Sequence, residues 1–450
     1  MKIPKAATAD KERLYRRNAC LSIGDAMFFM IMTGLVTPFQ GVYLLGLGGT
    51  NFQVAWLNAL PPLVTALCVL PATRYISARN EHYLPVVLAS SAINRLFYLI
   101  YGLIPFVVVW PSLRPLVFIL LFGLATIPGT YSNLAWTSMI GRLIPRSRRG
   151  RFFGLRNTLS VAISMIATLF GGLMLDHYPF PINFTYIFII AFGGVLCSLA
   201  LLAFTVEYDA EQELETVSAT PRGNGGEPAQ LQPIHYASHD LTRFYLATFL
   251  VHLGINMIGP ILTIYHVRIL KLDNTVIGLL ATVSSLASVA TYVIWGRLSD
   301  RIGNLKTMIG VIVGLVVFSA AYLVDRQLWF LILMNLLNGA FTAGFGLIIF
   351  NLLLEISPPQ ERSNTIAYFN LNANLSSFIA PLLGTALVLG NNLWFPFILA
   401  ALIRIAAMVV FWMIGRPSPG WMEYLKIHWM ESRISISNRL LNRKRRNFRA

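Results

Sequence analysis

Apolar segments long enough to cross a membrane recur along the whole chain. A transmembrane helix needs about 20 consecutive, mostly apolar residues, and twelve segments of the sequence meet this requirement. In the first half they are 19–46, 52–73, 84–106, 115–140, 152–175 and 182–206. In the second half they are 242–267, 275–295, 307–324, 329–354, 364–389 and 394–415. This pattern predicts an all-α integral membrane protein with twelve transmembrane helices.

Charged residues are few, and the basic ones are unevenly placed. Charged side chains make up 12% of the 450 residues, about half of the roughly 25% found in soluble domains. Nearly all of the 35 Lys and Arg residues fall on one side of the predicted helices. Because cytoplasmic loops carry an excess of Lys and Arg, we expect both termini in the cytoplasm. We also expect the basic loops and tail to bind anionic lipid headgroups rather than nucleic acid, which would require a soluble basic face.

A polar segment separates the predicted helices into two sets of six. It begins with acids at alternate positions and continues with Gly, Pro, Gln and Ser, a composition typical of a flexible linker. The predicted parts are a cytoplasmic N-terminus (1–18), an N-terminal six-helix bundle (19–206), the cytoplasmic linker (207–240), a C-terminal six-helix bundle (241–415) and a basic cytoplasmic tail (416–450). The bundles repeat each other, since a constant shift in numbering pairs Pro38 with Pro260 and Arg79 with Arg301.

One loop carries a specific motif. It reads GRLSDRIGNLK, from residue 296 to residue 306, and lies between two apolar segments. It resembles the loop signature of the major facilitator superfamily of transporters at Gly296, Asp300, Arg301 and Gly303. Asn304 and Leu305 depart from that signature, which has basic residues there. The resemblance implies two pseudo-symmetric six-helix bundles, in agreement with the internal repeat.

Polar residues occur on the helices that line the central cavity in that family. The resemblance assigns this role to the first, fourth, seventh and tenth helices, and each carries polar side chains along one stripe. The substrate-cavity candidates are Thr37, Gln40, Asn133, Trp136, Asn256, Asn335, Asn338 and Thr342. Side-chain hydrogen bonds also join packed membrane helices, so a contact between helices is the alternative for each residue.

Four ionisable residues stand out inside the predicted helices, where a charge costs roughly 3 kcal/mol or more near the bilayer centre. Asp25 is a candidate for the ion-coupling group, the alternative being an ion pair with an arginine at the inner end of its helix. His252 is a second coupling candidate because imidazole titrates near neutral pH; a hydrogen-bonded structural residue is the alternative. Arg95 and Arg404 lie on helices that are outer, supporting ones in the family. We expect structural pairing or lipid contact there, and an anionic substrate if either faces the cavity.

The resemblance also assigns an inner gate at the cytoplasmic ends of the helices. In the family, the Asp and Arg of the motif act with an acid ending the tenth helix and an arginine beyond it. The corresponding gate residues are Gly296, Asp300, Arg301, Gly303, Glu355, Arg362 and, from the first half, Arg79. At the positions that correspond to Asp300 and Glu355, the first half has Ala78 and Arg142. We therefore expect the closed gate to depend mainly on the C-terminal half.

The sequence predicts a transporter rather than an enzyme. It contains no catalytic motif, no phosphate-binding loop and no metal-ligand cluster, so we expect no cofactor and no metal. A monomeric secondary transporter that moves a small molecule by alternating access, coupled to protons or another ion, is expected. Gly171 and Gly172 form part of an exporter element of the family and slightly favour efflux of amphipathic compounds by antiport. Uptake of a neutral polar solute such as a sugar is the alternative, and a membrane scaffold or sensor is the alternative outside transport. The expected location is a prokaryotic inner (plasma) membrane.

Overall fold

The structure is a computed structural model that describes residues 5–78, 82–207, 238–358, 362–388 and 393–414. The described part is helical and contains no strand. The first half contains α1 (Lys5–Val36), α2 (Gln40–Gly46), α3 (Asn51–Ser77), α4 (Leu84–Val107), the 3-10 turn η1 (Pro111–Leu113), α5 (Arg114–Leu143), α6 (Arg146–His177) and α7 (Ile182–Ala203). The second half contains α9 (Ser238–Ile264), the π-helical turn η2 (Tyr265–Ile269), α10 (Asn274–Ile302), α11 (Asn304–Ala321), α12 (Leu328–Ile356), α13 (Arg362–Ala386) and α14 (Trp394–Met413).

Eleven helical segments of the described part are long and apolar enough to cross a membrane. They correspond to eleven of the twelve predicted segments. The exception is α13, whose run of asparagines lowers its mean hydropathy. It nevertheless packs lengthwise between α3 and α9 within the helical assembly. The prediction of an all-α, multi-pass membrane fold is confirmed.

The first predicted helix, 19–46, is wrong at both ends. The helix α1 begins much earlier, at Lys5, and it ends at Val36. A turn at residues 37–39 then separates it from the short helix α2. Pro38 accounts for the early end, because it has no backbone N–H to donate and disfavours helical geometry in the residue before it. The earlier start adds the polar and basic residues that precede the apolar segment.

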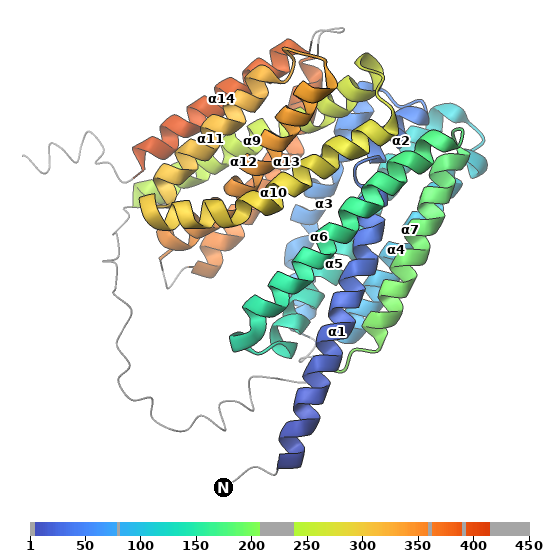
Figure 1. Ribbon diagram of the computed structural model, residues 1–450, viewed down its shortest axis with the longest axis vertical. Coiled ribbons are helices and arrows are strands. Elements are labelled where there is room, and N and C mark those ends of the chain that lie inside the picture. The colour runs from blue at the N-terminus through green and yellow to red at the C-terminus, as the bar shows by residue number, and fades with distance from the viewer. Residues whose placement is uncertain (1–4, 79–81, 208–237, 359–361, 389–392, 415–450) are drawn as a thin grey trace, which may run out of the picture.

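The two halves repeat the same packing pattern (Figure 1). In the first half α1 packs on α6 and α7, α5 packs on α3 and α4, and α4 also packs on α7. In the second half α9 packs on α13 and α14, α12 packs on α10 and α11, and α11 also packs on α14. Each of these five contacts in one half therefore has its counterpart in the other. The prediction of two pseudo-symmetric bundles is confirmed.

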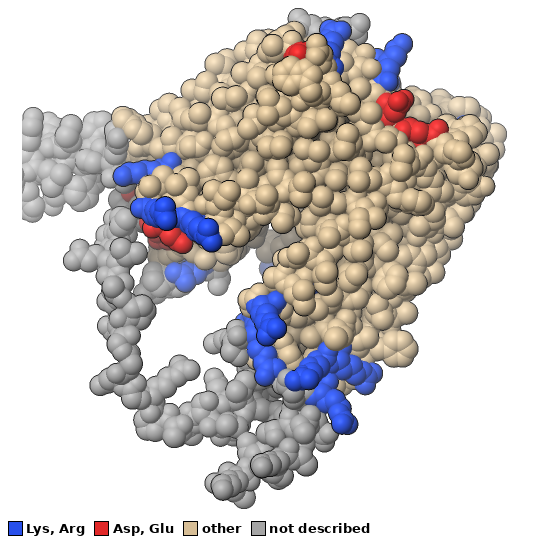
Figure 2. All heavy atoms as spheres, viewed as in Figure 1, with Lys and Arg blue, Asp and Glu red and all other residues tan. Residues whose placement is uncertain are grey.

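The bundles meet at one end of the molecule and separate at the other. Contacts between them run through two equivalent helix pairs, α3 with α13 and α6 with α10. We call the end where the bundles meet the closed end. At the opposite end, where α1 and α6 begin, Figure 2 shows a hollow between the bundles. Arginines and lysines gather on both sides of this hollow, and we call this the basic end.

A glycine contact inside the C-terminal bundle yields a test of this packing. A Cβ atom at Gly339 of α12 would overlap the backbone carbonyl of Ser284 in α10. We predict that Gly339→Ala lowers stability by about 1–3 kcal/mol, the usual effect of overpacking. Thermal unfolding of the purified protein in one detergent measures the loss. Gly346→Ala on the same helix is the matched control, because nothing lies within 4 Å of its added Cβ. Equal melting temperatures for the two variants would contradict the prediction.

Candidate functional site

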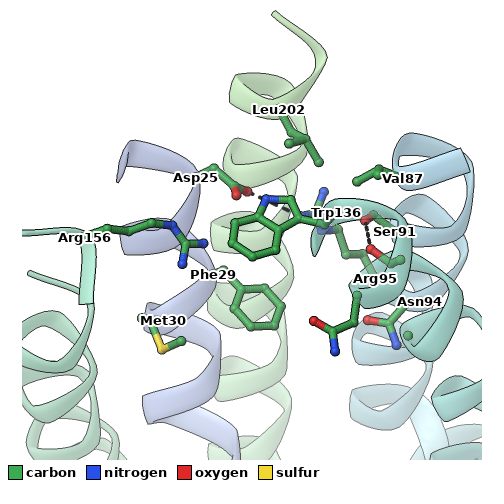
Figure 3. A pocket seen from close by; sticks show the side chains of 13 residues that line it. Asp25, Phe29, Met30, Val87, Ser91, Asn94, Arg95, Trp136, Arg156 and Leu202 are labelled. Atoms are coloured by element: carbon green, nitrogen blue, oxygen red, sulfur yellow. Dashed lines mark hydrogen bonds and ion pairs between the residues drawn. The ribbon is translucent and has the colours of Figure 1, made fainter. Parts of the chain in front are cut away.

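The N-terminal bundle encloses a cavity of about 280 Å³ (Figure 3). Its walls come from α1, α4, α5, α6 and α7, so five of the six crossing helices of this bundle contribute. The lining residues are Asp25, Phe29, Met30, Val87, Ser91, Asn94, Arg95, Gly129, Ser132, Asn133, Trp136, Arg156 and Leu202. One carboxylate, two guanidinium groups and several apolar side chains thus share one space.

Asp25 is buried beside an arginine and a serine. Only 6% of its surface is exposed. The hydroxyl of Ser198 on α7 donates a hydrogen bond to Asp25 Oδ1 at 2.5 Å. Arg95 Nη2 on α4 donates to the same hydroxyl oxygen at 2.8 Å and lies 3.8 Å from Asp25 Oδ1. The ion-pair partner of Asp25 is therefore the mid-helix Arg95 and not an arginine near the start of α1.

Arg156 forms the opposite wall of the cavity. Its guanidinium carbon lies 4.4 Å from the ring centre of Trp136, in cation–π geometry. Its Nε donates a long hydrogen bond of 3.4 Å to the carbonyl of Ser22. The sequence analysis missed this residue, which lies in the first turns of the predicted fifth helix. The available signal was an arginine placed inside an apolar segment, the same signal that identified Arg95.

The predicted cavity residues divide into two groups. Asn133 and Trp136 line the cavity beside Asp25, as Figure 3 shows for Trp136. The others lie elsewhere: Thr37 at the turn after α1, Gln40 at the start of α2, Asn256 on α9, and Asn335, Asn338 and Thr342 on α12. The coupling candidate His252 also lies on α9. The cavity therefore brings together two of the four candidates from the first half and none from the second half.

Polar side chains of the C-terminal bundle bond to their own surroundings. Asn256 Nδ2 donates to Ser377 Oγ at 3.0 Å, which ties α9 to α13. Asn335 is buried and donates to the hydroxyl of Tyr322 at 3.1 Å. His252 Nδ1 lies 2.8 Å from the carbonyl oxygen of Thr248, one turn earlier in α9. The bonds of Asn256 and Asn335 reach neighbouring segments, as polar residues commonly do in packed membrane proteins, whereas the contact of His252 stays within α9.

Arg404 lies fully enclosed in the C-terminal bundle, with 1% of its surface exposed. Its guanidinium donates to the carbonyl of Leu315 and the hydroxyl of Ser319 on α11, and to the carbonyl of Gly254 on α9 at 2.9 Å. A Cβ at Gly254 would press on the Arg404 side chain. Arg404 on α14 thus links α9 and α11 to its own helix by hydrogen bonds, which agrees with the structural pairing expected from the sequence.

The predicted gate residues lie at the basic end, where the bundles are apart. Asp300, Arg301 and Arg362 are exposed. Glu355 accepts a hydrogen bond of 2.8 Å from Asn304, one of the two positions that depart from the family motif. Gly303 has φ = 88°, a conformation that favours glycine. Gly296 lies in α10, one turn before Asp300. Arg79 lies outside the described residues, as do the linker from 208 to 237 and the tail.

Two charged residues join the bundles at the closed end. Asp176, at the end of α6, accepts four hydrogen bonds of 2.6–2.9 Å from the backbone and side chains of Asn274 and Thr275. These residues begin α10, so a carboxylate of one bundle caps a helix of the other. In return, Arg268 of η2 donates to the Gly49 carbonyl at 2.6 Å and to Asn51 Oδ1 at 2.7 Å. The sequence analysis did not identify this pair.

The described residues hold no group of three or more His, Cys, Asp or Glu side chains that could bind a metal ion.

Comparison with known proteins relates the whole helical part to transporters. The sequence model described as "Major Facilitator Superfamily" matches residues 21–239 and 244–434. A "Multi-drug resistance efflux pump PmrA homolog" of Lactococcus lactis subsp. lactis is 26% identical over 83% of this chain and 88% of its own length. A "Multidrug resistance protein MdtG" of Serratia proteamaculans is 24% identical over 84% of this chain and 89% of its own length.

Two solved structures share the fold at low sequence identity. One is a bacterial homologue of the iron transporter ferroportin in an inward-facing state, with a TM-score of 0.65 and 16% identity over 89% of this chain and 98% of that one. The other is the nucleoside transporter NupG, with a TM-score of 0.65 and 12% identity over 90% of this chain and all of that one.

The closed end provides a test of how firmly the bundles are joined. We predict that Asp176→Asn raises the population with this end open by about tenfold, because an amide NH2 then faces the backbone donors of α10. Pulsed electron paramagnetic resonance between spin labels at Phe52→Cys and Leu328→Cys, in a variant without the native Cys20, Cys68 and Cys197, reports the distance distribution.

The matched control for this experiment is Asp273→Asn. Asp273 occupies the N-cap position of α10 but makes no capping hydrogen bond with its side chain. Its replacement should leave the distance distribution unchanged. A shift of equal size in both variants would show that the hydrogen bonds of Asp176 do not hold the closed end together.

Proposed function

This chain belongs to the Major Facilitator Superfamily, and we propose that it exports amphipathic compounds by alternating access, with proton movement coupled through Asp25. That it is a multi-pass membrane transporter, and not an enzyme, follows from its family, its helices and its relatives. Export is supported by relatives named as multi-drug resistance efflux pumps. Because those relatives are bacterial, we place the protein in the plasma membrane, with its basic end in the cytoplasm by the positive-inside rule.

The observation that carries the proton coupling is the buried Asp25. A carboxylate inside a membrane bundle is expensive to maintain and is usually functional. Here it faces a cavity and interacts with Arg95 and Arg156, so gain or loss of one proton changes the charge of the whole site. A proton that binds in one conformation and is released in the other couples proton binding to the conformational change.

The arrangement of the bundles supports alternating access. The contacts at the closed end and the hollow at the basic end correspond to one of the two states that this mechanism requires. We propose that this is the inward-facing state. In the opposite state, Asp300, Arg301, Glu355 and Arg362 would approach the N-terminal bundle and form the inner gate through charge-assisted hydrogen bonds. Protein motion of this kind is a population shift between two states.

Uptake of a neutral polar solute is less well supported. That function requires free amide groups around the central space, whereas Asn256 and Asn335 are bonded to Ser377 and Tyr322. A scaffold or sensor would not need an acid in a cavity. The cavity around Asp25 therefore favours transport.

The coupling role of Asp25 is testable in liposomes. We predict that Asp25→Asn reduces substrate-dependent proton movement at least 100-fold, because the amide cannot exchange a proton. The parent protein is reconstituted, a pH gradient is imposed, and a pH-sensitive dye inside the liposomes is followed after addition of amphipathic compounds. Asp325→Asn, a loop acid away from the cavity, is the control and should retain the parent rate. Proton movement at the parent rate in Asp25→Asn would exclude this residue as the coupling group.

Anionic lipid binding at the basic end gives a second test. In the first turns of α6, Arg149 donates to the carbonyls of Ile144 and Gly141 and thereby secures the end of α5, whereas the Arg151 side chain is exposed. We predict that Arg151→Glu lowers the melting temperature in anionic lipid nanodiscs only, since it removes headgroup attraction worth roughly 1 kcal/mol. Arg149→Glu should lower it in neutral and anionic nanodiscs alike. An equal effect of Arg151→Glu in both lipids would argue against headgroup binding there.

A further inference from the structure

We infer that the cavity beside Asp25 binds an anionic group of the transported compound, a carboxylate or similar oxyanion, between Arg95 and Arg156. The inference rests on the proposed transport function and specifies the charge of the substrate. It follows from the charge balance of the cavity, from its unused hydrogen-bond donors and from the apolar side chains beside them.

The charge balance of the cavity is positive. Two guanidinium groups and one carboxylate line it, and every other lining side chain is neutral. Asp25 lies 3.8 Å from Arg95 and compensates one positive charge. Among the described residues, no carboxylate lies within ion-pair distance of Arg156. An uncompensated charge in a membrane-embedded site is costly, and an anion entering the cavity removes this cost.

Two sets of hydrogen-bond donors in the cavity lack a partner. Arg95 is 5% exposed, and its Nη1 makes no hydrogen bond to any described residue. The two terminal nitrogens of Arg156 also donate to no residue of the described part, since only its Nε is bonded. Guanidinium groups present paired N–H donors that match the two oxygens of a carboxylate. The geometry therefore provides donors on both sides of the space.

The remaining wall suits the apolar part of an amphipathic molecule. Phe29 and Trp136 present aromatic rings beside the charged groups, as Figure 3 shows, and Met30 and Leu202 extend this surface. Binding sites commonly combine such an apolar surface with a few polar groups that fix orientation. A cavity of about 280 Å³ accommodates a small aromatic acid or the acidic end of a larger compound.

A cationic substrate would meet the opposite conditions. It would have to approach Asp25 past Arg95 and Arg156, and it would lose the attraction of a carboxylate that already has an arginine partner. The ionisable groups facing Asp25 are Arg95 of α4 and Arg156 of α6, with Tyr98 close to Arg95. The α5 and α7 helices contribute Trp136 and Ser198, which stay neutral. While Asp25 is ionised, the groups that face a ligand in this cavity therefore carry a net positive charge.

Three probes that share one ring system separate these cases. They are 1-naphthoate, 1-naphthylmethylammonium and 1-naphthylmethanol, and their binding to the full-length protein is measured by calorimetry in nanodiscs of zwitterionic lipid. We expect naphthoate to bind at least tenfold more tightly than the ammonium probe, a difference of about 1.4 kcal/mol. Tighter binding of the ammonium probe, or no binding of naphthoate, overturns the inference.

Variants test the assignment of the two arginines. Arg156→Gln and the charge-balanced double variant Asp25→Asn/Arg95→Gln should each weaken naphthoate binding about tenfold and leave naphthylmethanol unchanged. Arg297→Gln, an exposed arginine of α10, is the matched control for loss of one positive charge. Unchanged naphthoate affinity in both arginine variants overturns the inference.

The binding experiment is independent of the transport assay. It uses no ion gradient, so failure of anion binding leaves proton-coupled export by this protein intact. Conversely, the variants can change anion binding as expected while the transport assay shows no coupled proton movement. That result would support the anion site and contradict the proposed proton coupling.

Discussion

The compensation of charge inside a low-dielectric bundle is the constraint on which the rest of this structure depends. Both bundles bury an arginine, and both bond its guanidinium to a serine hydroxyl across equivalent helices. In the N-terminal bundle Arg95 of α4 reaches Ser198 of α7, and in the C-terminal bundle Arg404 of α14 reaches Ser319 of α11. The helices α4 and α7 correspond to α11 and α14. The arginine therefore comes from the first helix of the pair in one bundle and from the second helix in the other, but the same two helices are joined in both bundles. Since isolated charges in such surroundings are expensive, each arginine fixes the packing of the helices around it.

The two bundles differ in what the arginine meets on the innermost helix. Arg404 meets the carbonyl of Gly254 on α9, and the absence of a side chain there lets the arginine fill the space. Arg95 meets the carboxylate of Asp25 on α1, and a cavity remains beside the pair. A carbonyl dipole cannot titrate, whereas a carboxylate can. The same architecture therefore produces a passive tie in one bundle and a site with variable charge in the other.

Much of the fold is predictable from the sequence because the membrane leaves few choices. Lengths of apolar segments, the linker and the internal repeat together lead to two six-helix bundles, although the first helix begins earlier than predicted and ends before Pro38. The site is harder to predict because its parts are distant in sequence. Asp25, Arg95 and Ser198 lie on three helices, so nothing in the spacing relates them. The capping of α10 by Asp176 is not predictable from the sequence for the same reason. A capping residue normally lies directly before its helix, whereas Asp176 belongs to the other bundle.

The placement of charges also explains how two similar bundles can act unequally. At the closed end each bundle contributes one charged residue that bonds to the other bundle, Asp176 from the N-terminal bundle and Arg268 from the C-terminal one. Both contacts must break if that end opens. At the basic end the two acids that we propose for the gate, Asp300 and Glu355, belong to the C-terminal bundle. The cavity that contains Asp25, in contrast, belongs to the N-terminal bundle. In this proposal, a proton or ligand bound near Asp25 changes the charge on one side of the interface, and the gate acids respond on the other side. Coupling between the cavity and the gate then requires each bundle to move as a unit. The contacts of Arg95 and Arg404 with neighbouring helices make this possible, because they hold each bundle together.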